Sequence, residues 1–403
     1  METRTIELAS VIKDIAAGPF GSNLKVSCFV EEGFPIIDGA NLKGIKVTDN
    51  VTKFVTEEKA RSLHRSIASR GDVVVTISGN VGQIAYIPND SQYAEYLVSQ
   101  RQFRVTFDTE QVYVPYLVYY FHTYEGQHKI LAFANQTGVP ALAQPLKNFK
   151  KITVNLPALN EQKRIASICE AITGKMESTD QINDNLQQQA YAYFLRLFVE
   201  NADPSWRVGT IADLGTVVGG GTPSKAKQEY YTEDGIAWIT PKDLSIDKSK
   251  FIAHGENDIS ELGYQSSSAT MMPAGTVLFS SRAPIGYIAI ASNEVTTNQG
   301  FKSVVPHPEI GTSFVYYFLI HNLPLIESKA SGSTFKEVSG SVMKSVEAVI
   351  PDGDALAKFD DFCRPVFEMQ RKLEQENRKL AAMRDSLLPR LMSGEIDVAD
   401  VEV

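Results

Sequence analysis

The feature that most constrains this chain is an internal repeat. Three blocks align in the same order at offsets of roughly 200 residues: residues 18–42 with 220–244, 71–85 with 275–289, and 138–198 with 332–392. Identity within each block is low, but chance does not readily produce three blocks in one order at nearly one offset. The period is far longer than the 20–50 residues of solenoid repeats. The sequence therefore predicts two similar units in tandem.

Each unit opens with a mixed region rich in short apolar runs. Runs such as VVVTI, IAYI and FRVTF in the first unit, and TVLF, YIAIA and FKSVV in the second, predict strands. Glycine and proline between these runs predict turns. The segments YLVYYFHTY and FVYYFLIH predict short buried helices, with a strand as the alternative. Each mixed region ends at a Leu-Pro or Ile-Pro pair, at residues 156–157 and 350–351.

A long helical pattern follows each of these proline residues. Apolar side chains recur there at alternating spacings of three and four residues, which is the a/d seam of a coiled coil. The seam comprises Ile165, Ile168, Ile172, Ile182, Leu186 and Tyr193 in the first helix, and Phe359, Phe362, Val366, Met369, Leu373, Leu380, Met383 and Leu387 in the second. Pro365 is expected to kink the second helix or to mark its start.

The fold class expected is α+β with four segments along the chain. Residues 1–157 and 201–351 form the mixed domains, and residues 158–200 and 352–403 form the long helices and the tail. A helix of about 40 residues is about 60 Å long and cannot bury a one-sided seam alone. We therefore expect the two helices to pair as an antiparallel coiled coil. This pairing would relate the units by a pseudo-two-fold axis and would place the mixed domains at opposite ends of a rod.

Composition places the chain among globular, cytoplasmic proteins. No apolar run approaches the ~18 residues of a membrane span, and the start METRTIELAS lacks the pattern of a secretory signal. The three cysteines, Cys28, Cys169 and Cys363, are too few for a disulfide scaffold. In an antiparallel helix pair Cys169 and Cys363 would lie about 25 Å apart, which is too far for a disulfide.

The sequence contains no recognisable catalytic or metal-binding constellation. It lacks the GxxxxGK[ST] loop of nucleotide-binding proteins, and its six histidines show neither HExxH nor HxH spacing. The net charge of −9 is the wrong sign for a simple nucleic-acid binder. The charge is uneven, however: residues 1–150 hold 15 basic and 15 acidic side chains, and seven of the basic ones fall within residues 43–70. A local positive face and an ordinary mixed surface are equally open there.

Two motifs, supported by a third segment, carry a resemblance to a known family. LPALNEQKRIASICEAI at 156–172 is similar to the LP-x-x-x-EQ-x-x-IA entry into the first long helix of type I restriction–modification specificity subunits. LAAMRDSLLPRLMSGEI at 380–396 resembles that family's C-terminal motif, and TFKEVSGSVMKSVEAVIP at 334–351 resembles its approach to the second helix. The alternation of two variable regions with two long helices extends the resemblance over the whole chain.

The resemblance implies a non-catalytic DNA-specificity subunit. Each mixed domain would be a target recognition domain that contacts one half of a bipartite double-stranded DNA sequence, and the helices would set the spacer between the halves. The helices would also dock two methyltransferase (modification) subunits, and motor/nuclease (restriction) subunits would complete the complex. No cofactor is expected on this chain, because S-adenosylmethionine would be bound by the methyltransferase subunits. Much of the affinity for phosphates could then come from those partners.

Basic and amide residues on loops are the candidates for base contacts, because arginine or lysine pairs with guanine and asparagine or glutamine with adenine. Asn80 and Arg282 fall in the same turn of the two repeats. The candidates are Lys43, Lys46, Lys53, Arg61, Arg65, Arg70 and Asn80 in the first domain, and Lys225, Lys227, Lys242, Lys248, Lys250 and Arg282 in the second.

Two other functions remain open at this point. The chain could be a methyltransferase or nuclease with its own recognition domains, which binding of S-adenosylmethionine to the purified chain would reveal. It could instead be a protein-binding scaffold, with two globular heads on a coiled-coil rod and no role on DNA. Net charge favours the scaffold, whereas the two motifs favour the specificity subunit.

Overall fold

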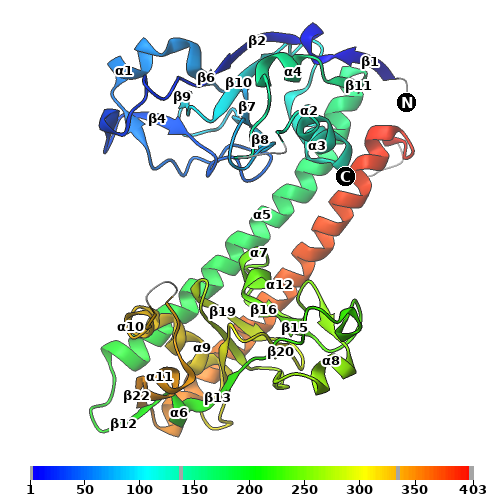
Figure 1. Ribbon diagram of the computed structural model, residues 1–403. Coiled ribbons are helices and arrows are strands. Elements are labelled where there is room, and N and C mark those ends of the chain that lie inside the picture. The colour runs from blue at the N-terminus through cyan, green and yellow to red at the C-terminus, as the bar shows by residue number, and fades with distance from the viewer. Residues whose placement is uncertain (1–2, 136–138, 333–335, 399–403) are drawn as a thin grey trace. The chain divides into compact units, whose positions relative to one another are not determined.

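A computed structural model describes residues 3–135, 139–332 and 336–398 of the chain (Figure 1). It divides into two compact units. Unit 1 comprises residues 1–176 and 379–403, and unit 2 comprises residues 177–378. Both long helices thus contribute one part to each unit. Gly138 of the third repeat block, the start of the motif at 334–351 and residues 399–403 of the tail lie outside the described residues.

Unit 1 is built on a four-stranded antiparallel sheet in the order β2-β10-β7-β8. Its strands are β2 (Ile12–Ala17), β10 (Gln102–Phe107), β7 (Val73–Thr76) and β8 (Ile84–Tyr86). A second sheet has the order β3-β5-β4-β9-β6. Its strands are β3 (Phe29–Val30), β5 (Phe54–Val55), β4 (Phe34–Ile37), β9 (Glu95–Val98) and β6 (Ile67–Ser69), and a separate pair joins β1 (Thr3–Glu7) to β11 (Thr153–Pro157).

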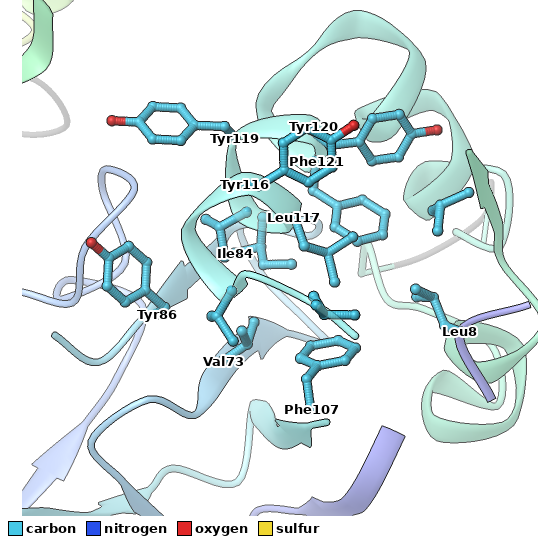
Figure 2. Packing of buried hydrophobic residues seen from close by; sticks show 14 of the residues in the cluster. Leu8, Val73, Ile84, Tyr86, Phe107, Tyr116, Leu117, Tyr119, Tyr120 and Phe121 are labelled. Atoms are coloured by element: carbon cyan, nitrogen blue, oxygen red, sulfur yellow. The ribbon is translucent and has the colours of Figure 1, made fainter. Parts of the chain in front are cut away.

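The core of unit 1 lies where α2 packs on the four-stranded sheet. Every residue of α2 from Val114 to Phe121 is buried, since the helix is covered on all sides. Figure 2 shows Leu117 and Phe121 of this helix with Val73 and Ile84 of the sheet. The helices of this part are α1 (Glu57–Ser62), α2 (Val114–His122), α3 (Tyr124–Leu131) and α4 (Pro145–Lys150).

Unit 2 repeats this architecture. Its main sheet has the order β13-β21-β18-β19-β16, with β13 (Gly215–Gly219), β21 (Lys302–Pro306), β18 (Val277–Ser281), β19 (Ile285–Ala291) and β16 (Phe251–Ile252). The paired short strands are β12 (Arg207–Thr210) with β22 (Glu347–Ile350), β14 (Tyr231–Thr232) with β17 (Asp258–Ile259), and β15 (Trp238–Ile239) with β20 (Thr296–Thr297). The helices are α6 (Ile211–Leu214), α7 (Pro241–Ile246), α8 (Glu261–Gln265), α9 (Thr312–His321), α10 (Leu323–Ser328) and α11 (Gly340–Ser345).

The two units confirm the internal repeat. The order β2-β10-β7-β8 corresponds to β13-β21-β18-β19, the pair β1–β11 to β12–β22, and the buried helix α2 to α9. All six apolar runs predicted as strands are strands, and both YYF segments are helices. The predicted α+β class with two tandem mixed domains is confirmed.

Two long helices are shared between the units. Helix α5 runs from Leu159 to Leu195 and continues as a π turn over Arg196–Glu200, and α12 runs from Gly353 to Ser393. At 1.5 Å per residue these helices are about 55 and 60 Å long. Pro365 lies inside α12, so the expectation that it marks the start of the helix is wrong. Helix α12 instead begins soon after Asp352, whose carboxylate accepts a hydrogen bond from the backbone N–H of Ala355.

The helices pack against each other within each unit. In unit 1, Ile165 and Ile168 of α5 share a core with Leu388 and Leu391 of α12. In unit 2, the side-chain amide of Gln370 donates to the carbonyl of Asn183 at 3.2 Å, and Asn377 donates to the carboxylate of Asp180 at 2.6 Å. The residue numbers rise along α5 as they fall along α12, so the pairing within unit 2 is antiparallel, as predicted.

Part of the predicted seam does not lie in this contact. Ile182, Met369 and Met383 are about half exposed (51%, 49% and 52%), whereas Phe362, which is 37% exposed, still contacts α5, since its ring centroid lies 4.7 Å from that of Tyr193. The residues that follow Ile182, Met369 and Met383 are less exposed: Gln370 is buried, and Asn183 and Arg384 are half-buried. One seam row is thus displaced by a single residue from the predicted one. The apolar pattern failed to indicate it because this row contains amides and an arginine.

The remaining seam residues are buried or half-buried. They are Ile165, Ile168, Ile172, Leu186, Tyr193, Phe359, Val366, Leu373, Leu380 and Leu387. Cys169 and Cys363 are buried as free thiols in the cores of units 1 and 2 respectively. None of the described helices combines the length and the apolar run that a bilayer crossing needs.

Candidate nucleic-acid interface

A cavity of about 560 Å³ with a mixed polar and apolar lining opens in unit 1 between β4, the β7–β8 turn and the loop before β10. Its lining includes Asp38, Lys53, Asn80, Gln83, Gln100, Arg101 and Gln102, with Leu24, Val26 and Phe29 forming an apolar wall. Amide, cationic and apolar groups are among the side chains that read base edges in the major groove. The cavity is therefore the first candidate contact surface.

Hydrogen bonds hold the inner wall of this cavity in place. The amide of Gln102 donates to the hydroxyl of Thr76 at 3.4 Å, and that hydroxyl donates to the amide oxygen of Gln83 at 3.3 Å. Gln102 is almost fully buried (1% exposed), whereas Asn80, Gln100 and Arg101 are exposed at the rim. The inner amides fix the framework, and the outer three side chains are free to meet a ligand.

One ion pair lies in the first cavity. The ammonium of Lys53 donates to the carboxylate of Asp38 at 2.6 Å. Burial opposes ionisation of Asp38, but the hydrogen bonds from Lys53 and from the N–H of Ala40 outweigh it and lower the pKa of the carboxyl group. The carboxylate thus offsets the charge of Lys53 and leaves Arg101 as the exposed cation of this rim.

A second cavity, of about 610 Å³, occupies unit 2. Lys225, Lys242, Glu256, Arg282, Asn298 and Gln299 line it, together with Trp238. Lys242 pairs with Glu256 at 2.5 Å, and the guanidinium of Arg282 lies 3.6 Å from the carboxylate of Glu337. The indole N–H of Trp238 donates to the carbonyl of Gly221 at 2.9 Å, which fixes the wall between the cation-bearing loops.

The two cavities occupy the same place in the two repeats. Each is bounded by the segment that leads into the second strand in the order of the main sheet. This segment is Gln100–Gln102, which leads into β10, in unit 1, and Asn298–Gly300, which leads into β21, in unit 2. In both units a glycine allows the facing loop to approach this segment closely. A Cβ atom at Gly18 would lie 1.9 Å from the carbonyl oxygen of Ser99, and one at Gly220 would lie 2.0 Å from that of Asn298. The backbone framework is therefore shared, and the side chains on it differ.

Two of the seven unit 1 candidates, Lys53 and Asn80, line the first cavity. The guanidinium of Arg61 forms ion pairs with the carboxylates of Glu57 at 2.8 Å and Glu95 at 2.7 Å, and Arg70 donates to the carbonyl of Ser91. Lys43, Lys46 and Arg65 are exposed outside the cavity lining. The structure thus gathers only part of this set.

In unit 2, Lys225, Lys242 and Arg282 line the second cavity. Lys227 donates to the hydroxyl of Tyr230 at 2.8 Å, and Lys248 is exposed elsewhere on the unit. The shared turn that contains Asn80 and Arg282 therefore reaches the cavity in both units, whereas the flanking lysines do not all do so.

Lys250 is buried, and its prediction as a DNA contact is wrong. Its ammonium donates to the amide oxygen of Gln370 and to the hydroxyl of Tyr317, and it lies 4.3 Å from the ring centroid of Phe367. Burial lowers the pKa of this amine to about 7. The backbone N–H groups of Lys250 and Phe251 donate to the carboxylate of Glu374 at 2.8 and 3.2 Å. Lys250 therefore joins the sheet of unit 2 to α12.

The sequence search missed Gln83, Gln100, Arg101 and Gln102 in unit 1 and Asn298 and Gln299 in unit 2. The repeat contained the signal, since an offset of 198 aligns Phe103 with Phe301 and places SQRQ over TNQG. Two polar segments that both precede a predicted strand could have been recognised as corresponding loops. In the described part of the chain, no group of three His, Cys, Asp or Glu side chains could hold a metal ion.

Comparison with known proteins agrees with this two-part organisation. The profile of the family described as "Type I restriction modification DNA specificity domain" matches residues 26–188 and again residues 204–366. Together the two matches cover most of the chain, and each contains one of the two cavities.

Two relatives and one solved structure carry corresponding names. The chain is 38% identical over 185 residues to the specificity subunit of the type I restriction enzyme MjaIX of Methanocaldococcus jannaschii, and 29% identical over 194 residues to that of the HindI enzyme of Haemophilus influenzae. These matches cover 44% and 47% of this chain and 42% of each relative, so they span less than half of either relative.

The solved structure is the S subunit of a type I restriction–modification system from M. genitalium. It has a TM-score of 0.56 and 15% identity, over 97% of this chain and 96% of that chain. This similarity supports the fold. On the two profile matches, the chain belongs to the family of type I restriction–modification DNA specificity domains.

Proposed function

We propose that this chain is the DNA specificity subunit of a type I restriction–modification complex. The cavity of each unit contacts one half of a bipartite double-stranded DNA target, and the long helices set the unread spacer between the halves. The observation that carries this proposal is the pair of corresponding cavities, one in each family match, with the same backbone framework and different polar side chains. A subunit that reads two different half-sites needs this combination.

The electrostatics of the two rims fit contacts to base edges. Arg101 in unit 1 and Arg282 in unit 2 can each present a planar guanidinium to a guanine, and Asn80 and Gln100 can present amides to an adenine. The net charge of −9 argues that this chain alone does not provide the main phosphate affinity. We assign that affinity largely to partner subunits, and base readout to this chain.

The partners in this proposal are two methyltransferase subunits docked on the helices, with motor/nuclease subunits completing the enzyme. Ile182, Met369 and Met383 are about half exposed on α5 and α12, and apolar side chains on a helix surface are suited to such docking. S-adenosylmethionine would be bound by the methyltransferase subunits. This chain would supply no catalytic group and would have no contact with a membrane.

The test is co-expression of the chain with its neighbouring methyltransferase subunit in a host free of DNA methylation. Modified adenines are then mapped by single-molecule sequencing. We expect one split motif with a methylated adenine in each half. A soluble complex that adds no methylation would contradict the proposal and favour the protein-binding scaffold. Binding of S-adenosylmethionine to this chain alone would favour an enzyme.

A domain exchange tests the assignment of one half-site to each domain. Replacement of residues 1–157 by the first domain of another family member should change one half of the methylated motif and leave the other half intact. If both halves change, the domains do not read their half-sites independently.

A further inference from the structure

Phe20 is an exposed aromatic residue beside the first cavity. It lies in the loop after β2, and 83% of its side chain is open to solvent. Val26, further along the same loop, is 81% exposed and lines the cavity. An exposed ring of this kind contributes no hydrophobic stabilisation to the fold, because its surface is not buried. Its place in the loop that supplies Leu24 and Val26 to the first cavity is therefore informative.

The backbone under Phe20 is held firmly. The N–H of Gly18 donates to the carbonyl of Gln102 at 2.8 Å, and Pro19 is buried. The N–H of Asn23 closes a tight turn by donating to the carbonyl of Phe20 at 2.8 Å. Gly21 lies against Gln100, because a Cβ atom there would be 3.0 Å from the amide oxygen of that residue. The ring thus projects from a supported loop.

Two arginines line the two cavities that adjoin this loop. Arg101 belongs to the first cavity, whose residue Gln100 lies against Gly21. Arg65 lines, together with Phe20, a neighbouring cavity of about 360 Å³. Among the described residues neither arginine has a carboxylate within 4 Å. Arg65 is near enough to Asp14 to help lower its pKa, but the carboxylate of Asp14 accepts its bond from Arg104 at 2.6 Å.

Unit 2 has no such residue at the corresponding place. The alignment of Gly18 with Gly220 places Thr222 where unit 1 has Phe20. The hydroxyl of Thr222 donates to the amide oxygen of Gln299 inside the second cavity. The exposed aromatic ring is therefore a feature of the first loop alone and is not required by the shared framework.

Resting on the function proposed above, we propose that Phe20 is a wedge that inserts between base pairs of the first half-site. Apolar side chains inserted into a base step unstack it and bend the duplex. Arg65, which lines the neighbouring cavity together with Phe20, would contact a phosphate beside the opened step and fix the register of the ring, while Arg101 contacts a base of the same half-site. The second half-site would be bound without such insertion. The two halves of the target would then differ in deformation as well as in sequence.

The experiment uses the complex with the methyltransferase subunits and target DNA in which 2-aminopurine replaces one base of the first half-site at a time. Unstacking raises the fluorescence of this base. We expect an increase at one step with the wild type and none with Phe20→Ala, together with about tenfold weaker binding. Phe20→Leu should retain most of both signals. Tyr124→Ala is the matched control, because Tyr124 is 87% exposed and lines neither cavity.

DNA with an abasic site at the affected step provides a second measurement. The cost of unstacking is already removed there, so the wild type should bind this DNA more tightly than intact target and Phe20→Ala should gain much less. Unchanged fluorescence and affinity in Phe20→Ala would overturn the wedge. So would loss of the methyltransferase subunits from Phe20→Ala, which would make the ring a protein contact. A wild-type complex that binds no DNA would instead overturn the proposed function itself.

Discussion

Both cavities contain amides and one lysine–carboxylate ion pair, but the cavity of unit 1 adds one exposed arginine and an apolar wall, whereas that of unit 2 adds a second lysine, an arginine and an indole. The framework beneath them does not differ in this way. Gly18 and Gly220 press equivalent loops onto Ser99 and Asn298 in the two units. The repeat thus keeps the residues that position a loop and varies the residues that the loop presents.

The two units also differ in how their sheets meet the long helices. In unit 2 the carboxylate of Glu374 accepts two backbone N–H groups from the start of β16. In unit 1, Glu170 of α5 is half-buried, has its pKa raised by burial, and receives only partial compensation from the charge of Lys46. The carboxylate of Glu374 therefore holds a strand in place, whereas burial of the Glu170 carboxylate has a cost that the charge of Lys46 offsets only in part.

The largest expected effect is a difference in unfolding free energy between variants of these two carboxylates. Glu374→Ala leaves two buried N–H donors without an acceptor, each at a cost of about 1–3 kcal/mol, so the free energy of unfolding should fall by about 2–5 kcal/mol. Glu170→Ala is the matched control, and we expect it to cost little. Denaturant unfolding monitored by circular dichroism measures both. Equal losses in the two variants would show that the anchors are alike.

The second expected effect tests whether the two loops are built alike. Valine at Gly18 or Gly220 would place its Cβ atom about 2 Å from a backbone carbonyl oxygen. Each variant should lose about 1–3 kcal/mol of unfolding free energy. Gly44→Ala and Gly219→Ala are the controls, because a Cβ atom at either site meets nothing within 4 Å. If Gly18→Val were tolerated and Gly220→Val were not, the loops would not be equivalent.

The sequence indicated the scaffold better than the site. Apolar runs predicted three strands of the main sheet in each unit and the helices α2 and α9, because burial selects apolar side chains directly. The seam row containing Asn183 and Gln370 escaped this pattern because its side chains are polar, and the amide of Gln370 donates across the helix pair to the carbonyl of Asn183. Lys250 was expected to be a surface cation, and only the fold brings Gln370, Tyr317 and the aromatic rings around its amine.

The site residues were harder to predict, for a related reason. The search for DNA contacts followed the density of basic residues, which led to residues 43–70. Several cations there are engaged with neighbouring groups, as Arg61 is with Glu57 and Glu95. Arg101 lies outside that basic segment, and it reaches the cavity because β10 pairs with β7 and the loop before β10 contacts Gly18 closely. Which side chains meet at the cavity depends on strand pairing, and the density of basic residues along the sequence does not indicate that pairing.

The third expected effect concerns the half-site that each cavity contacts. Arg101→Ala should weaken binding of the complex to its target by about 1–2 kcal/mol and relax selectivity only in the first half. Arg282→Ala should have an effect of similar size in the second half. Competition binding with DNA altered in one half at a time measures both. Loss of selectivity in the same half for both variants would break the correspondence between cavities and half-sites.

The smallest expected effect compares the ion pairs of the two cavities. Asp38 is mostly buried beside Lys53 and has a lowered pKa, whereas Lys242 and Glu256 are both more than half exposed. A carboxyl group with a lowered pKa in the folded state contributes stability above its unfolded pKa of about 3.9, and this contribution disappears as the pH falls through the folded value.

Asp38→Asn should therefore cost up to about 1 kcal/mol at pH 7, and the cost should shrink below about pH 4. Glu256→Gln should change the unfolding free energy little at either pH, since solvent screens its pair with Lys242. Unfolding curves of the three proteins between pH 3 and pH 7 provide the measurement. A cost for Asp38→Asn that does not depend on pH would mean that the side chain stabilises the loop by its shape, through the bond from the N–H of Ala40, and that charge has no part in the difference between the cavities.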